Sequence, residues 1–103
     1  MGEWVRVARL SELPAGSMRY CEVAGVPVCL VHAASGIRAV QDTCTHDEAS
    51  LCDGYLEGDV LECPLHQATF DVRTGKVLSP PATVDLKVFD VAVDGDEVRV
   101  REA

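Results

Sequence analysis

The sequence predicts an all-β protein with an antiparallel framework, and three observations support this fold class. Short segments alternate between apolar and polar residues, which is typical of half-buried strands. Glycine, proline and aspartate residues separate these segments at short intervals, as turns do. Little of the chain shows the period of an amphipathic helix. The length of 103 residues suits one domain with a single modest core.

Four strands are expected in the N-terminal part of the chain. They cover residues 4–8, 18–23, 26–31 and 37–40. Pro14-Ala15-Gly16 and Gly25 supply turns between the first three strands, because proline fixes φ and glycine accepts positive φ. A short Ala-Ala-Ser-Gly sequence separates the third strand from the fourth, so these two strands are expected to form a hairpin.

Extended segments in the C-terminal part are also joined by tight turns. Residues 55–62 turn at Gly58-Asp59, residues 69–72 and 76–78 flank a turn, and residues 87–93 and 97–101 are joined through Asp94-Gly95-Asp96. Pro80-Pro81 follows the second of these pairs and cannot continue a central strand, because proline donates no ladder hydrogen bond.

Two segments, residues 42–54 and 62–70, show neither period and contain cysteine with histidine. The first includes Cys44-Thr45-His46 and the second includes Cys63-Pro64-Leu65-His66. Each segment offers one thiolate and one imidazole, which is half of a four-ligand metal site. The expected hairpin between them would bring the two loop tips together. The sequence therefore predicts one metal centre built from both loops.

Two cysteines and two histidines suit either zinc or an iron–sulfur cluster. Zinc fingers usually combine a Cys-Cys knuckle with a His-His pair on a helix. Here each loop mixes the two ligand types, and no helix is expected after either loop. The spacing favours an iron–sulfur cluster but leaves zinc open.

The spacing of these motifs resembles the signature of Rieske [2Fe–2S] proteins: Cys-x-His, sixteen residues, then Cys-x-x-His. Flanking segments extend the resemblance over nearly the whole chain: residues 53–58, residues 70–76 and Pro80-Pro81. With these segments included, the sequence resembles the ferredoxin components of bacterial multicomponent dioxygenases of the biphenyl and naphthalene type, which act in aromatic hydrocarbon catabolism.

The resemblance implies a Rieske fold, which is an antiparallel β-sandwich framework with a cluster-binding subdomain of two loops. Residues 1–103 would form a single Rieske [2Fe–2S] domain, with cluster-binding loops at about 42–54 and 62–70. It further implies one cluster per chain, with Cys44 and Cys63 on one iron and His46 and His66 on the other. Two thiolates leave the oxidised centre formally neutral, which makes it easier to reduce than an all-thiolate cluster.

Other positions depart from the high-potential members of the family. Ala49 and Leu65 stand where those relatives have a disulfide, and Ala68 and Phe70 stand where they have serine and tyrosine hydroxyls. Fewer hydrogen bonds to the cluster sulfurs predict a low reduction potential. After the second histidine the family often has glycine, whereas this chain has Gln67, which would be strained if φ were positive there.

Three further cysteines lie outside the motifs. The family commonly has serine at the position of Cys52, so Cys52 is expected to be a bystander and not a fifth ligand. Cys21 and Cys29 are expected on strands, where free cysteine packs as a small apolar residue. A disulfide between Cys21 and Cys29 is the alternative. Outside the motifs, only His32 remains as a third histidine, expected at a strand end as a surface or turn residue.

Composition and charge limit the classes of function that are expected for this protein. The net charge of −8 disfavours binding to nucleic acid or to anionic membranes and favours partners with basic docking patches. No apolar run approaches the length of a membrane span, and residues 1–6 lack the pattern of a secretory signal. An odd number of cysteines also argues against a secreted disulfide framework. A cytoplasmic location is expected.

The expected function is that of a soluble one-electron carrier. A terminal Rieske oxygenase needs two more histidines and a carboxylate for its mononuclear iron, and this chain has too few. We therefore expect a monomer without catalytic residues or a small-molecule substrate. It would pass electrons from an NAD(P)H-dependent flavin reductase to a terminal Rieske non-haem iron oxygenase through transient contacts. The alternatives are a small subunit of a larger reductase, such as a nitrite reductase, and a zinc-stabilised interaction module.

Overall fold

The computed structural model describes residues 2–45, 48–65 and 67–103, and in these residues the regular structure is two antiparallel sheets with two short 3₁₀ helices. The six strands of the larger sheet lie in the order β1 (Val5–Arg9), β10 (Glu97–Glu102), β9 (Val88–Asp94), β4 (Gly36–Gln41), β3 (Val26–Ala33) and β2 (Met18–Val23). The smaller sheet has the order β5 (Tyr55–Glu57), β6 (Val60–Glu62), β7 (Thr69–Asp71) and β8 (Val77–Ser79). The prediction of an all-β, antiparallel fold is confirmed.

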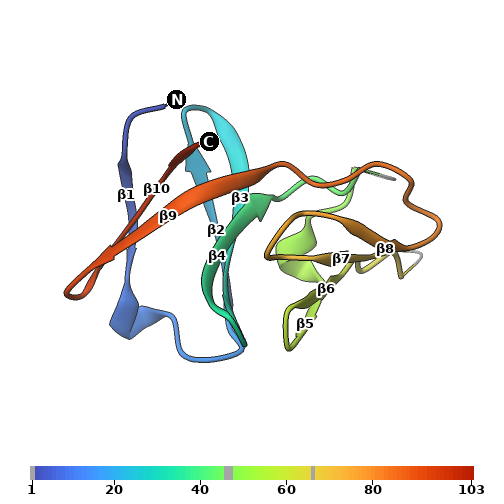
Figure 1. Cartoon of the computed structure of the whole chain (residues 1–103), viewed down its shortest axis with the longest axis horizontal. Helices are drawn as coiled ribbons and strands as arrows, with labels where there is room; N and C mark the ends of the chain where they lie inside the picture. Colours follow the sequence, from blue (N-terminus) through green and yellow to red (C-terminus); the bar gives the residue numbers. More distant parts are fainter. Residues whose placement is uncertain (1, 46–47, 66) are drawn as a thin grey trace.

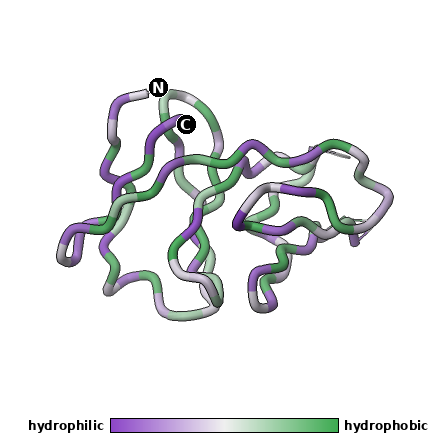
Figure 2. The backbone as a smooth tube through the Cα atoms, viewed as in Figure 1, coloured by the Kyte–Doolittle hydropathy of each residue, from purple (hydrophilic) through white to green (hydrophobic). Residues whose placement is uncertain are grey.

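The predicted strands appear close to their expected positions, with ends shifted by one or two residues. The prediction missed two 3₁₀ helices, η1 (Leu10–Glu12) and η2 (Leu51–Asp53). Each is a single turn, too short to produce a sequence period. Figure 2 shows the turn between β9 and β10 as a hydrophilic end of the molecule, as expected for Asp94-Gly95-Asp96.

One core lies inside the larger sheet, whose two edge strands, β1 and β2, come close together so that the sheet folds over on itself. Its members come from all six strands and from Leu13. Val28 and Leu30 of β3 point into this core, whereas Cys29 and Val31, which alternate with them along the strand, point to the opposite face. Because β3 is buried on both faces, it is a nearly continuous apolar run.

A second core lies between β3 and β4 of the larger sheet and the smaller sheet. It includes Val31 and Val40 from the larger sheet and Leu61 and Phe70 from the smaller one. Figure 1 shows the smaller sheet as a separate lobe beside the larger sheet, with the segment between β8 and β9 running around its outer end. This second core packs the lobe that contains both predicted cluster loops against the larger sheet.

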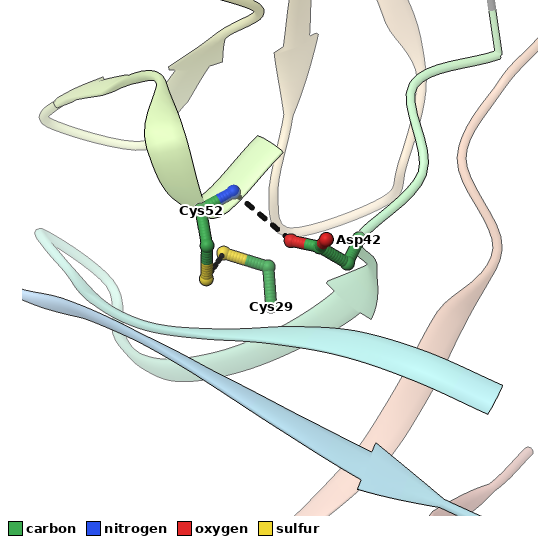
Figure 3. A group of neighbouring side chains, drawn as sticks. All are labelled: Cys29, Asp42 and Cys52. Carbon is green, nitrogen blue, oxygen red and sulfur yellow. Dashed lines mark hydrogen bonds between the residues drawn. The ribbon is translucent and has the colours of Figure 1, made fainter. Parts of the chain in front are cut away.

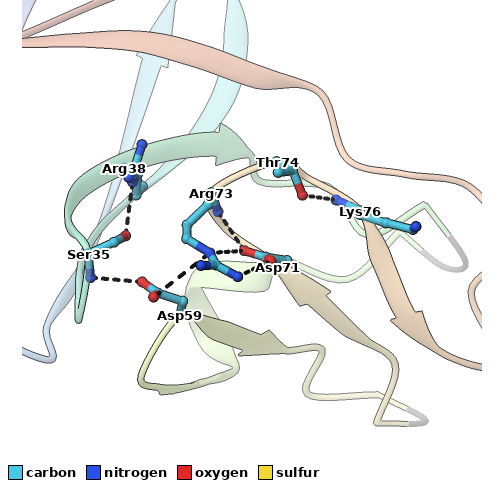
Figure 4. A network of polar contacts seen from close by, with 7 residues as sticks. All are labelled: Ser35, Arg38, Asp59, Asp71, Arg73, Thr74 and Lys76. Carbon is cyan, nitrogen blue, oxygen red and sulfur yellow. Dashed lines mark hydrogen bonds and ion pairs between the residues drawn. The ribbon is translucent and has the colours of Figure 1, made fainter.

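A polar network also connects the two sheets at their turns (Figure 4). Asp59, in the turn between β5 and β6, accepts a hydrogen bond from the backbone N–H of Ser35 at 2.9 Å. Arg73 then pairs with Asp71 at 2.9 Å and lies 3.9 Å from Asp59. The network joins the turn between β3 and β4 to two turns of the smaller sheet.

Across the described ranges, no helix has the length and apolarity needed to cross a membrane.

Candidate metal centre

The first predicted loop leaves the large sheet after β4 and returns at η2. Thr43 and Ser50 form an isolated antiparallel bridge at its base. Directly above this bridge, the N–H of Cys44 donates a hydrogen bond to the carbonyl oxygen of Ala49 at 3.0 Å. We call residues 44–49 loop 1. Cys44 is thus the first residue of a closed six-residue excursion.

The second predicted loop connects β6 to β7 and closes in the same way. Glu62 and Thr69 are the last paired residues of the two strands. Directly above them, the N–H of Cys63 donates to the carbonyl oxygen of Ala68 at 2.8 Å. We call residues 63–68 loop 2. Both loops therefore begin with a cysteine and end with an alanine that are joined by the same backbone hydrogen bond.

The two cysteines are buried in the same core. Cys44 is 4% exposed and Cys63 is fully buried, and both belong to the cluster that includes Leu51, Leu61 and Ala68. Two thiolates in such a site would be costly without a cation to balance them. Thiolate is also the ligand that iron–sulfur clusters require. The described residues of both loops thus fit a buried iron–sulfur cluster.

The predicted histidine ligands, His46 and His66, lie outside the described residues. The third histidine, His32, is the second-last residue of β3, so its predicted position near a strand end is confirmed. It is half-buried, and one of its ring nitrogens is 2.8 Å from the carbonyl oxygen of Leu13. This contact joins the end of β3 to the segment after η1, which the sequence did not predict.

Neighbouring segments fix the two loops in place. The hydroxyl of Thr45 donates to the carbonyl oxygen of Val84 at 2.6 Å, so the segment after Pro80-Pro81 lies against loop 1. Gly54, just after η2, packs so tightly against the backbone of Glu62 that a β-carbon would collide with the Glu62 carbonyl oxygen. Gly54 thus brings the end of the first segment directly against the residue that precedes Cys63.

Asp42 is a structural residue of the site that sequence reasoning missed. It is 4% exposed, and its carboxylate accepts hydrogen bonds from the backbone N–H of Cys52 at 3.0 Å and from the hydroxyl of Ser50 at 2.6 Å. Its carbonyl oxygen accepts from the N–H of Leu51 at 2.7 Å. An aspartate in a polar segment gives no sequence signal of burial, because its partners are set by how the chain returns.

Gln67 adopts a positive φ, the conformation that the sequence analysis expected to be strained for glutamine. Its φ is 62°, in the left-handed region that glycine occupies at lower cost. The loop therefore needs positive φ at this position, and the chain accepts the strain of a glutamine there.

Comparisons with known proteins agree with this geometry. A family model described as the Rieske [2Fe–2S] domain matches residues 3–90. The ferredoxin component of naphthalene 1,2-dioxygenase/salicylate 5-hydroxylase systems from Ralstonia sp. is 39% identical over 98 residues, which cover 95% of this chain and 94% of the relative.

Two solved structures give the same result in three dimensions. The ferredoxin of carbazole 1,9a-dioxygenase from Nocardioides aromaticivorans IC177 superimposes with a TM-score of 0.91 at 36% identity, covering 97% of this chain and 98% of that one. A chain of the complex of reduced oxygenase and oxidised ferredoxin in carbazole 1,9a-dioxygenase gives a TM-score of 0.90 at 41% identity, covering 95% and 92%.

Buried cysteines at the start of two matched loops of an antiparallel β framework, together with these relatives, define an iron–sulfur protein. The chain belongs to the Rieske [2Fe–2S] domain family. It carries a single [2Fe–2S] cluster and is an electron carrier rather than a catalytic enzyme.

Proposed function

We propose that this protein is a freely diffusing, monomeric carrier of the cytoplasm that supplies electrons to a terminal Rieske non-haem iron oxygenase. An NAD(P)H-dependent flavin reductase would reduce it, and the whole chain, residues 1–103, would act as one Rieske domain. The names of its relatives support the oxygenase as a partner, since several are ferredoxin components of dioxygenase systems. A solved complex of an oxygenase with a related ferredoxin supports direct contact between the two proteins.

The proposed ligands are Cys44, His46, Cys63 and His66. The observation that carries the proposal is the matched closure of the two loops, which places one buried cysteine at the start of each. When bound, the cluster takes up and releases one electron at a time. The role of the two cysteines is to supply thiolates from a site that excludes water, and the role of the two closing hydrogen bonds is to fix the backbone of each ligand.

The surface around the loops supports a docking role. Leu65, in loop 2, is 48% exposed, and Val84, whose carbonyl bonds to loop 1, is 58% exposed. Exposed apolar residues beside a redox site favour a small, short-lived interface, because they gain free energy when water is removed. In this proposal they form part of the face that meets the oxygenase.

The acidic charge supports partners with basic docking surfaces. With a net charge of −8, encounter with such a surface is accelerated at low ionic strength. We expect the bimolecular rate of reduction by the flavin reductase to fall as salt rises from about 0.01 to about 0.2 M, because the Debye length shortens over that range. A rate that is independent of salt would contradict electrostatic steering.

The apolar neighbours of loop 2 are expected to keep the reduction potential low. Ala68 and Phe70 are both fully buried beside Cys63 in the second core and offer no side-chain hydrogen-bond donor. Phe70→Tyr would add a hydroxyl, and one hydrogen bond to a cluster sulfur is worth tens of millivolts, on the order of 1 kcal/mol. Redox titration should show a rise in potential for Phe70→Tyr, and an unchanged potential would reject this explanation.

Two experiments test the proposed function. In the first, a reductase and oxygenase from a naphthalene-type system are combined with NADH, and product formation should require this protein. In the second, the reduced protein is examined by EPR, where mixed ligation lowers the mean g value relative to all-cysteine clusters. His46→Cys and His66→Cys should shift that spectrum, whereas Cys21→Ser should keep it. Parent-like spectra for both histidine variants would overturn the ligand assignment.

A further inference from the structure

Two cysteines that are not proposed as ligands lie against each other behind loop 1. The sulfur atoms of Cys29 and Cys52 are 2.7 Å apart (Figure 3). A disulfide has an S–S length of about 2.05 Å, so joining these two sulfurs requires an approach of less than an ångström. The residues are 23 positions apart in sequence and come from different elements.

Both cysteines are fixed by their surroundings. Cys29 is fully buried in β3, where its strand pairs with β2 on one side and β4 on the other. Cys52 lies in η2, and its backbone N–H is bonded to the carboxylate of Asp42 at 3.0 Å. Because neither backbone is free to move away, the contact between the sulfurs is a property of the fold.

The third free cysteine does not share this contact. Cys21 pairs with Val28 across β2 and β3, whereas Cys29 pairs with Tyr20. Directly opposed residues lie on the same face of a sheet, so Cys21 and Cys29 lie on opposite faces. A Cys21–Cys29 disulfide is therefore excluded by the register, and the prediction that both are free cysteines packed as small apolar residues is confirmed. Burial raises the pKa of the Cys21 thiol to about 11, which leaves it as an unreactive thiol.

A metal site formed by these residues is less consistent with the observed contacts than a pair of contacting thiols. Cys29, Asp42 and Cys52 each offer a ligand atom within 4.8 Å of the others. However, one carboxylate oxygen of Asp42 accepts from the N–H of Cys52 and the other accepts from the hydroxyl of Ser50. The carboxylate is thus already engaged in holding the base of loop 1.

We propose that Cys29 and Cys52 form a dithiol–disulfide pair that is oxidised by hydroperoxides. The sulfur of Cys52, after its thiol proton is lost, attacks one oxygen of hydrogen peroxide and the O–O bond breaks. The hydroxide that leaves takes up that proton and is released as one water, and a sulfenic acid remains on Cys52. The sulfur of Cys29 then attacks that sulfenic acid. An S–S bond forms, the S–O bond breaks, and the Cys29 proton leaves with the hydroxide as a second water. Two thiols lose two electrons, and one peroxide becomes two waters.

The order of the two steps follows from exposure. Cys52 is a partly exposed residue whereas Cys29 is fully buried, so a small oxidant that enters from solvent meets Cys52 first. The hydrogen bond with Cys52 and burial raise the pKa of the Cys29 thiol well above its usual range, so it stays protonated until Cys52 has reacted. Cys52 is therefore the first thiol to be oxidised and Cys29 the one that resolves it.

The product would restrain the base of loop 1. The disulfide would join the centre of β3 to η2, which begins two residues after the end of loop 1. A covalent link between these elements opposes the local opening through which a buried cluster would be lost. The protein with the Cys29–Cys52 disulfide is expected to release iron to a chelator several-fold more slowly than the protein in which both cysteines are thiols.

The test is disulfide mapping of the cluster-loaded protein after treatment with equimolar hydrogen peroxide without oxygen. Combined digestion with trypsin and a glutamate-specific protease separates all five cysteines onto different peptides. We expect one cross-link, between residues 23–38 and residues 49–57, and a mass lower by two hydrogen atoms. The visible absorption of the cluster should be unchanged when this cross-link appears.

Two variants complete the test. Cys21→Ser is the matched control and should form the same cross-link as the wild-type chain, whereas Cys52→Ser should form none and should release iron equally before and after peroxide. The mapping of the wild-type chain gives a result even if a variant fails to fold. The proposal is overturned if the cluster is bleached before the thiols react, if Cys52 stops at sulfenic or sulfinic acid, or if a metal ion beyond the two irons protects both thiols.

Discussion

Loop 1 and loop 2 close with the same backbone hydrogen bond but rest on different supports. Loop 2 continues the ladder of β6 and β7, in which three residue pairs lie below it. Below loop 1 the described residues form the isolated bridge between Thr43 and Ser50 and one backbone hydrogen bond, from the Leu51 N–H to the Asp42 carbonyl oxygen. One cysteine is therefore held by a regular sheet and the other by a nearly isolated turn.

A buried carboxylate takes the place of the missing ladder under loop 1. Asp42 bonds to Ser50 and Cys52 through its side chain and to Leu51 through its carbonyl oxygen. A ladder uses backbone groups that every non-proline residue has, so it tolerates substitution, whereas a carboxylate support depends on one side chain. The comparison indicates that a single substitution destabilises loop 1 more readily than loop 2.

The largest effect is expected where the two supports meet. In Gly54→Ala the new β-carbon would collide with the Glu62 carbonyl oxygen and lie 3.1 Å from that of Leu51. Because both contacts are with backbone atoms, relief requires the loops to separate, and we expect a loss of about 3 kcal/mol or more with poor cluster incorporation. Chemical unfolding and iron content would measure this.

Gly58→Ala is the control for that substitution. Its φ is +61°, but a β-carbon there meets nothing within 4 Å, so its cost is limited to backbone strain of about 1 kcal/mol. Equal losses for the two variants would show that the close approach at Gly54 does not matter.

The second-largest effect is expected at Asp42, and it distinguishes the support of loop 1 from that of loop 2. Asp42→Ala leaves the Cys52 N–H and the Ser50 hydroxyl without their acceptor, at a cost of up to about 1–3 kcal/mol for each of these partly buried groups. Asp42→Asn keeps one acceptor and should lose less. Hydrogen exchange should accelerate at Leu51 and Cys52 while the amides of β6 and β7 keep their protection.

Asp53→Ala serves as the control for Asp42, because Asp53 lies in the same segment but is exposed. If Asp42→Ala accelerated exchange equally in β6 and β7, the two loops would not have independent supports.

A smaller effect is expected from relieving strain in loop 2. Gln67 has φ 62°, and the left-handed region costs an ordinary residue about 1–2 kcal/mol, from which the added flexibility of glycine in the unfolded chain subtracts roughly 0.5–1 kcal/mol. Gln67→Gly should therefore raise the free energy of unfolding slightly. Ala24→Gly, at φ 52° in the turn between β2 and β3, should give a similar gain. A destabilised Gln67→Gly would mean that the glutamine side chain makes a favourable contact.

The smallest effect concerns the network of Figure 4, which joins the smaller sheet to the turn between β3 and β4 of the larger one. Hydrogen bonds from Arg73 lower the pKa of Asp71 below its ordinary value. The unfolded chain then binds a proton at higher pH than the folded one, so this stabilisation is complete above about pH 4 to 5 and is lost as pH falls through the lowered pKa. Arg73 is exposed to solvent, which screens its interaction with Asp71 and keeps the effect small.

Arg73→Ala tests that sign. The difference in unfolding free energy between wild type and variant should be constant near neutral pH and should shrink below about pH 4. A difference that grew in acid would reverse the assignment of the pKa shift.

Most strands were predictable because alternation and turn residues are local properties. The β9–β10 hairpin follows from Asp94-Gly95-Asp96, and β3 follows from its continuous apolar run. The family and its cluster were also predictable, since the spacing of cysteine and histidine is written directly in the sequence. The positions of the four ligands stay a prediction, supported for Cys44 and Cys63 by their burial.

The sequence by itself determined the strands, the two irregular loops that contain cysteine and the class of protein, because each depends on residues that are close together in the chain. Only the tertiary structure decided that Asp42 supports loop 1, that Cys29 contacts Cys52 and that Cys21 lies on the other face of its sheet. These contacts depend on strand register and on where a returning segment packs. A shift of one residue in register would place Cys29 on the opposite face, and neither composition nor spacing fixes that choice.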